Sequence, residues 1–321
     1  MKKIKTFLVV CLMSVISVIN VYGQDMAAAT DMYNAGATAL SESNFVAAIE
    51  SFNKALKMLD ALSAEDRGEE GDALVKEIKE VLPQIYLRYG KGLASSGEVG
   101  EAVVQLKKAI ESAKVVSAAD VVEEAEDLIP QLLLVNASNL LNDGNLEGAV
   151  EGFKQVIELQ PENSAAYLRM GLAYSRLNQE EEAIEAFEKA AEMGDADNAP
   201  RQLAVIYLRR SAAASRTRAW ADVFENAKKA NEYNETSNGH KLIGLAGVQL
   251  KKYDEAIAAL DSYLLSEPNA RDRNSILYNL AVAYEAKNDN AKACGYYKQL
   301  VNDATYKQIA EYKVNTQLKC N

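Results

Sequence analysis

Apolar residues recur every three to four positions along most of this chain, and the pattern is clearest between residues 164 and 197. This spacing is the period of a helix that buries one face. It predicts two short amphipathic helices joined by a turn at 177–179. Small residues such as Gly171 and Ala183 stand where two helices must approach closely, and large ones such as Phe187 stand between them. A lone hairpin leaves apolar surface uncovered, so we expect copies of the unit on either side.

The same pattern returns along nearly the whole chain. When each copy is numbered from its own first residue, position 8 is always small, position 20 is small or Val, and positions 24 and 27 are apolar. Position 8 is Gly36, Gly90, Ala137, Gly171, Ser211, Gly244 and Ala281. This pattern resembles the tetratricopeptide repeat (TPR), a helix-turn-helix unit of about 34 residues. The resemblance implies repeats at approximately 29–63, 83–116, 130–163, 164–197, 204–236, 237–270 and 274–307.

The resemblance implies an all-α fold, a right-handed α-solenoid of about seven TPR-like helical hairpins with a C-terminal cap helix at 305–319. This single solenoid would occupy residues 24–321. Composition agrees, because Ala, Leu, Glu and Lys are abundant, as helices prefer, and only 5 prolines are present. Hydrophobic residues make up 49% of the chain, which is ample for one continuous core.

Two kinds of irregularity interrupt the repeats. The acidic, glycine-containing segment 64–71 predicts an exposed loop. Pro83 and Pro130, which lie 47 residues apart, fall inside long first helices of the second and third repeats. A proline removes a helical hydrogen bond and kinks the helix, so we expect bends near 79–83 and 126–130. The alternative is a break that gives short extra helices.

Residues 1–23 resemble a secretory signal, with a lysine-rich start, a mostly apolar run at 7–19 and a cleavage site ending at Gly23. The apolar run is too short for a comfortable membrane span. After cleavage we expect no membrane insertion, and a location in the periplasm or at the outer membrane of a Gram-negative bacterium. Residues 8–11 imitate a lipoprotein box only poorly, so lipidation of Cys11 is the minor alternative.

The charge balance restricts the partners. The chain carries 46 acidic and 35 basic residues, and its net charge is −11. Such a chain is a poor binder of nucleic acid and of anionic membranes. The plain interpretation of the excess charge is solubility.

The sequence predicts no enzyme, no metal site and no cofactor. The one histidine, His240, stands at a packing position without a Cys or His partner, so a structural role is expected. No Gly-x-Ser-x-Gly elbow, phosphate-binding glycine loop or zinc spacing is present. The glutamates at 123–124 and 180–182 are interpreted as solvated helix faces.

Two cysteines follow the signal segment, Cys294 and Cys320, and an exported pair favours a disulfide. If the cap helix runs antiparallel to the helix before it, Cys320 overshoots Cys294 by around 10 Å. A disulfide needs alpha carbons within about 7 Å, so no bond is expected unless the tail bends back.

A Tyr-Leu-Arg triplet recurs at 86–88, 167–169 and 207–209. In the TPR family the first helices line a concave surface, and the resemblance places the triplets there. Leucines 87, 168 and 208 would anchor a ligand, and the arginines that follow them would guide it. The implied groove consists of Leu87, Arg88, Lys91, Leu134, Leu168, Arg169, Leu172, Arg176, Leu208, Arg209 and Arg216. Such a surface suits an apolar helix or an extended acidic segment. The alternative is that the arginines only form surface ion pairs and the leucines pack on the opposite wall.

The resemblance therefore implies a non-enzymatic adaptor that binds a protein or peptide along its concave face in the bacterial cell envelope. The carboxylate clamp that some family members use is absent, because leucine replaces its lysine at position 5. The alternative is a structural or self-associating scaffold of an outer-membrane assembly, in which case a homo-oligomer is expected.

Overall fold

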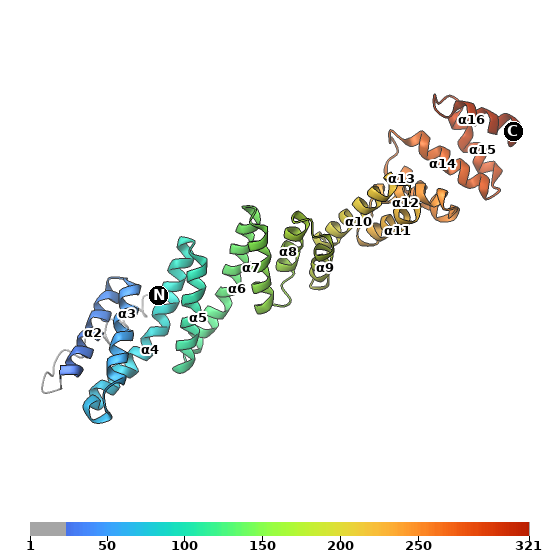
Figure 1. Ribbon diagram of the computed structural model, residues 1–321. Coiled ribbons are helices and arrows are strands. Elements are labelled where there is room, and N and C mark those ends of the chain that lie inside the picture. Colours follow the sequence, from blue (N-terminus) through green and yellow to red (C-terminus); the bar gives the residue numbers. More distant parts are fainter. Residues whose placement is uncertain (1–23, 321) are drawn as a thin grey trace. The chain divides into compact units, whose positions relative to one another are not determined.

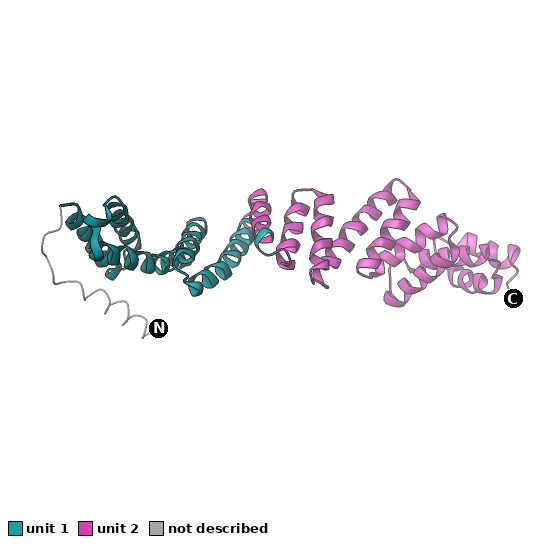
Figure 2. Ribbon diagram, turned by 90° about the horizontal axis from the view of Figure 1, so that it is seen from below, with its two compact units in different colours: residues 1–140, 158–160 teal, residues 141–157, 161–321 magenta. Residues whose placement is uncertain are grey.

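The computed structural model describes residues 24–320, and this range contains helices and turns but no strand (Figure 1). The expected all-α solenoid class is confirmed. The predicted signal segment, residues 1–23, lies outside the described residues. The described residues divide into two compact units, 24–140 with 158–160 and 141–157 with 161–320 (Figure 2). Among residues 24–320, no helix combines the length and the apolar character that crossing a bilayer requires.

Unit 1 is built from long helices around one core. Its helices are α2 (Gln24–Ser41), α3 (Phe45–Asp60), α4 (Ala64–Ser96), α5 (Val99–Val115) and most of α6 (Ala119–Asn142). The pairs α2–α3 and α4–α5 pack as hairpins. Phe52, Ile78 and Leu106 are fully buried in a shared cluster that extends into α6.

Unit 2 is a stack of shorter hairpins. Its helices are most of α7 (Leu146–Leu159), α8 (Ser164–Arg176), α9 (Glu180–Glu192), α10 (Asn198–Arg216), α11 (Trp220–Tyr233), α12 (Ser237–Gln249), α13 (Tyr253–Ser266), α14 (Arg273–Ala286), α15 (Asn290–Leu300) and α16 (Lys307–Tyr312). The hairpins α8–α9, α10–α11, α12–α13 and α14–α15 stack through α9–α10, α11–α12 and α13–α14 contacts.

The small residues at position 8 let the paired helices touch. A β-carbon built on Gly171 would lie 2.7 Å from Cδ1 of Phe187, and one on Gly90 would lie 2.9 Å from Cγ of Leu106. Both distances are too short for a methyl group, so a larger residue would push the helices of the hairpin apart.

The expected loop at 64–71 was wrong, because the segment is helical. Ser63 caps α4, and its Oγ accepts a hydrogen bond from the Asp66 N–H at 3.1 Å. The acidic residues in the first turn favour this helix start. The helix is interrupted at Gly68, whose φ of 58° and ψ of −173° are not helical, and then continues. A helix cap followed by helix-forming Glu and Ala residues favours a helix here more strongly than the acidic, glycine-containing composition favours a loop.

The helices α4 and α6 continue through Pro83 and Pro130, so the alternative of a helix break at the prolines was wrong. Both proline rings are buried.

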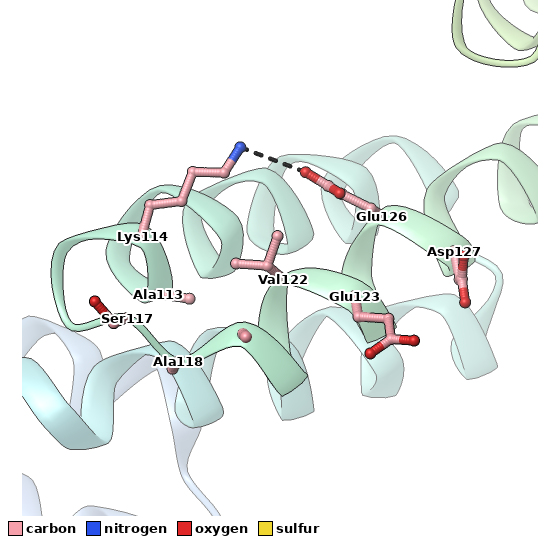
Figure 3. Close-up of a pocket in the computed structure, with 9 residues that line it drawn as sticks. Ala113, Lys114, Ser117, Ala118, Val122, Glu123, Glu126 and Asp127 are labelled. Carbon is pink, nitrogen blue, oxygen red and sulfur yellow. Dashed lines mark hydrogen bonds and ion pairs between the residues drawn. The ribbon is translucent and has the colours of Figure 1, made fainter.

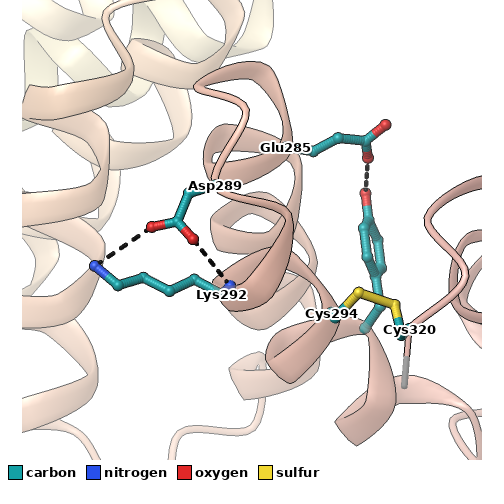
Figure 4. The surroundings of a disulfide bond; sticks show 6 residues. Glu285, Asp289, Lys292, Cys294 and Cys320 are labelled. Carbon is teal, nitrogen blue, oxygen red and sulfur yellow. Dashed lines mark hydrogen bonds and ion pairs between the residues drawn. A yellow bond between two sulfur atoms is a disulfide. The ribbon is translucent and has the colours of Figure 1, made fainter.

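The C-terminal cap differs from the straight helix expected at 305–319. After α16, the π-helix η1 (Lys313–Gln317) follows, and then the chain reverses, with Lys319 at a φ of 51° and the Cys320 N–H donating to the Val314 carbonyl at 2.8 Å. This bend brings Cys320 to Cys294, and the two form a disulfide with their alpha carbons 5.6 Å apart (Figure 4). The expectation of no bond was wrong because it assumed a straight helix.

One carboxylate fastens this cap to the last hairpin. Glu285 of α14 accepts hydrogen bonds from the Tyr297 hydroxyl at 2.9 Å, from Lys313 Nζ at 2.6 Å and from Gln317 Nε2 at 2.9 Å. The Glu285–Lys313 pair is the most shielded ion pair described, with side chains 19% and 18% exposed. Burial, together with this hydrogen bond to Glu285, raises the pKa of Tyr297.

Candidate peptide-binding surface

The expected anchor leucines differ in how far they are buried. Leu87 is only 2% exposed and belongs to the core of unit 1, so its side chain is not available to a ligand. The same cluster contains residues from the first half of α6, and Lys91 pairs with Glu124 of that helix. The extended first helix of the third repeat therefore covers this face of α4, which the repeat pattern alone does not reveal.

In unit 2 the leucines are more accessible. Leu168, Leu172 and Leu208 are half-buried and pack against the cluster that contains Phe187 and Leu203. Leu134, on α6 in unit 1, is also half-buried.

Several of the expected guide residues already have partners. Arg209 forms an ion pair with Glu180, and Arg176 Nη1 donates to the Leu141 carbonyl at 2.9 Å at the end of α6. Arg169 also has a partner within the protein. For these arginines, the alternative of internal pairing describes the structure better than a ligand-guiding role.

Arg210, which is not one of the expected groove residues, is the centre of the largest of these networks. It donates to Glu180 at 2.6 Å, pairs with Glu181 at 2.5 Å, and lies over the Tyr207 ring at 5.4 Å from its centre. Partial burial alone would raise the pKa of Glu180, but the hydrogen bonds from Arg210 and Arg209 outweigh it and lower that pKa. This network joins α9 to α10 and has a structural role.

Two of the expected residues remain unengaged. The guanidinium groups of Arg88 and Arg216 are exposed and make no ion pair or hydrogen bond within residues 24–320. Arg216 is the last residue of α10.

The end of α10 borders a pocket of about 220 Å³ within unit 2. Three consecutive first helices, α10, α12 and α14, contribute to it, together with the start of α11. The lining residues are Ser215, Trp220, Val223, Leu242, Leu245, Gln249 and Asn279. The pocket thus has apolar walls with a few polar groups, which is the usual character of a binding site.

The wall of this pocket is well supported. Trp220 and Leu242 pack against a cluster of Val223, Phe224 and Ala246. The buried Ser211 hydroxyl donates to the Val223 carbonyl at 2.8 Å and so ties α10 to α11. Trp220 is the only tryptophan in the chain.

The sequence signal for this pocket was partly present. Ser215, Leu245 and Gln249 occupy positions 12, 9 and 13 of their repeats, which the TPR resemblance assigns to the concave surface. The expected groove stops at the fifth repeat and therefore omits Leu245 and Gln249 of α12, and within the fifth repeat it omits Ser215. Trp220 lies on a second helix, and no position rule identifies it.

A larger but more open hollow of about 570 Å³ lies at the turn between α5 and α6 in unit 1 (Figure 3). Lys114 and Glu126 face each other there at 3.4 Å and neutralise one another. Much of the remaining lining consists of alanines with small side chains. The smaller pocket at Trp220 is more enclosed, and its apolar side chains are larger, namely Trp220, Val223, Leu242 and Leu245.

The one histidine of the chain has a carboxylate partner. The half-buried His240 lies in the first turn of α12, with Nε2 2.8 Å from Glu235. In the part of the chain that the structure describes, no three His, Cys, Asp or Glu side chains gather as a metal site would require.

Residues 134–200 and 240–307 match the family model of the tetratricopeptide repeat. These two stretches are tetratricopeptide repeats, and they make the chain a TPR protein over these residues. This fold is typical of adaptors in protein–protein interaction, which are generally non-enzymatic. No curated protein matches the chain significantly.

Solved structures of TPR proteins are similar to it at low identity. YrrB, described as a TPR protein with an unusual peptide-binding site, is 20% identical, with 60% of this chain and 94% of that chain covered and a TM-score of 0.35. The TPR domain of P58(IPK) is 15% identical, with 89% and 98% covered and a TM-score of 0.31. The thermophilic TPR protein TTC0263 of Thermus thermophilus is 18% identical, with 59% and 99% covered and a TM-score of 0.27.

Proposed function

We propose that the protein is a non-enzymatic adaptor that binds a linear segment of a partner protein on the first-helix surface of unit 2. The observation that carries this proposal is the pocket between α10, α12 and α14, because three successive repeats contribute to one apolar hollow. Half-buried leucines 168, 172 and 208 continue the apolar character onto α8 and α10. An extended segment that lies across several repeats would cover them and place one side chain in the pocket.

We further propose that this adaptor acts in the cell envelope. The signal-like segment 1–23 supports export, and the Cys294–Cys320 bond suits an oxidising compartment. Amino-terminal sequencing of the protein from its native host tests this proposal. A mature chain that begins at Gln24 in the envelope fraction is expected, and a cytoplasmic chain that retains Met1 would contradict it.

Trp220 makes the binding proposal directly testable, because a single tryptophan in the pocket reports on what enters it. We would select binders to residues 24–321 from a displayed library of random linear peptides. Selected peptides are expected to shift Trp220 emission. Leu245→Glu should abolish binding while circular dichroism remains that of a folded helical protein. Gln249→Glu, at an exposed position, is a milder second variant. If no peptide is selected, or if both variants bind as the parent does, the proposal fails.

A further inference from the structure

The charges around the Trp220 pocket define its partner more closely than its shape does. The pocket lies at the turn end of two hairpins, where α10 ends at Arg216, α11 begins at Trp220 and α12 ends at Gln249. Arg218 lies in the first of these turns and Lys251 in the second. All three cations are exposed, and their side chains make no ion pair or hydrogen bond within residues 24–320.

This part of the chain reverses the charge of the whole. Residues 198–221 contain five arginines and no acidic residue, although the net charge of the protein is −11. Arg209 and Arg210 are occupied by glutamates of α9, which leaves the cations at the pocket unneutralised. Among nearby acidic groups, Glu225 pairs with Lys252, and Asp222 lies in the first turn of α11, where a carboxylate favours the helix start.

The backbone adds independent support. Arg218 and Lys251 have φ values of 58° and 60°, a left-handed conformation that favours glycine or asparagine. The corresponding turns of the neighbouring hairpins carry asparagine at this place, Asn178 and Asn288. Long cationic side chains are thus held at two turns where the backbone favours other residues, as is common at functional sites.

The family model matches the repeats on either side of this segment better than the segment itself. Besides the residues before 134 and after 307, the two matched stretches leave out residues 201–239, which include most of α10 and all of α11. In this hairpin the packing positions 20 and 24 are Val223 and Ala227, where the preceding hairpin has Ala183 and Phe187. Departure from a packing pattern is expected where a segment serves another purpose.

We infer that the pocket binds one apolar side chain of an acidic linear segment, and that Arg216, Arg218 and Lys251 pair with the carboxylates beside that side chain. This inference rests on the proposed function. A hollow of about 220 Å³ is smaller than the ~300–1,000 Å³ typical of small-molecule sites and suits a single side chain. Arginine is well suited to carboxylate recognition because its planar guanidinium can form two parallel hydrogen bonds.

The test uses three synthetic peptides that share one central leucine and differ only in its neighbours, which are glutamates, glutamines or lysines. Trp220 emission of residues 24–321 reports binding, and the peptides contain no aromatic residue. The glutamate peptide is expected to bind most tightly, and the lysine peptide should not bind. Exposed pairs are worth roughly 0.2–1 kcal/mol each, so Arg216→Gln with Arg218→Gln should weaken the glutamate peptide about 2- to 30-fold and leave the glutamine peptide unchanged.

A matched control removes two exposed arginines of unit 2 that lie away from the α10–α11 and α12–α13 turns, Arg201→Gln in the first turn of α10 and Arg271→Gln just before α14. This control should leave all affinities unchanged. Gln249→Glu should lower the affinity of the glutamate peptide and raise that of the lysine peptide. Equal affinity for the glutamate and glutamine peptides, or equal loss with the control variant, overturns the acidic-partner inference. If library peptides of another charge bind and the Leu245→Glu variant releases them, the inference is overturned while the proposed function stands. If no library peptide binds, the proposed function fails.

Discussion

Removing the carboxylate of Glu285 should detach the C-terminal cap from the last hairpin. This one side chain accepts from Tyr297, Lys313 and Gln317. Glu285→Ala leaves the ammonium of Lys313, only 18% exposed, without a counter-ion, and the hydroxyl of a fully buried tyrosine without an acceptor. Breaking a buried pair costs about 3–5 kcal/mol, and partial exposure reduces this, so we expect a loss of about 2–4 kcal/mol in the local stability of the cap.

Native-state hydrogen exchange is the appropriate assay, because stacked repeats can open locally without global unfolding. A loss of about 2–4 kcal/mol corresponds to exchange roughly 30- to 900-fold faster in α16 and η1. Exchange in α8 and α9, several hairpins away, should not change. Glu311→Ala is the matched control, since it removes an exposed glutamate of the same cap whose pair with Lys307 is 4.0 Å long. If Glu285→Ala changes the exchange of the cap no more than the control does, Glu285 does not fasten the cap.

Three further outcomes follow from the packing, the covalent bond and the buried tyrosines. Gly171→Ala should destabilise the protein by about 1–3 kcal/mol because the added methyl group meets an aromatic ring. Gly92 is exposed and has open space around it, so Gly92→Ala should stabilise the protein by up to ~1 kcal/mol. The thermal midpoints of the two variants compare these effects. The Cys294–Cys320 bond spans 26 residues, and its reduction should lower the stability of the cap by about 3 kcal/mol. Hydrogen exchange in α16 should then be faster under reductant, and unchanged exchange would contradict this prediction. Burial and a hydrogen bond to a carboxylate raise the pKa of Tyr263 to about 12, above its unfolded value of 10.0. The contribution of this tyrosine to stability is therefore complete below pH 10 and is lost as the pH rises to about 12. The thermal midpoint should fall over this pH range, and a midpoint that does not change with pH would contradict the prediction.

Much of the fold could be predicted from the sequence because local and tertiary signals agree in the regular hairpins. The apolar period and the small residue at position 8 both result from the same contact between paired helices, as at Gly171 and Phe187. Prediction failed where a local feature outweighed composition. Ser63 and the acidic turn after it start a helix in a segment that composition marks as a loop, and the reversal at Lys319 brings Cys320 back to its partner.

The candidate site was less predictable, because position rules derived from single repeats do not describe how repeats cover one another. Leu87 occupies a groove position, yet its side chain is buried in a core that includes residues of the extended helix α6. Arg209 follows the anchor leucine as expected, but a glutamate of the preceding hairpin engages it. The pocket at Trp220 depends on four helices at once, and such convergence is visible only in three dimensions.

The measurement that tests the central claim most directly is to map where a selected peptide contacts the protein. The peptide would carry a photoreactive group beside its apolar anchor residue, and mass spectrometry would locate the adducts on residues 24–321. Adducts are expected on α10, α12 and the start of α11. With an acidic peptide, labelling should be weaker in the Gln249→Glu variant than in the parent protein. Adducts confined to the second helices α9 and α13, or to unit 1, would contradict the account.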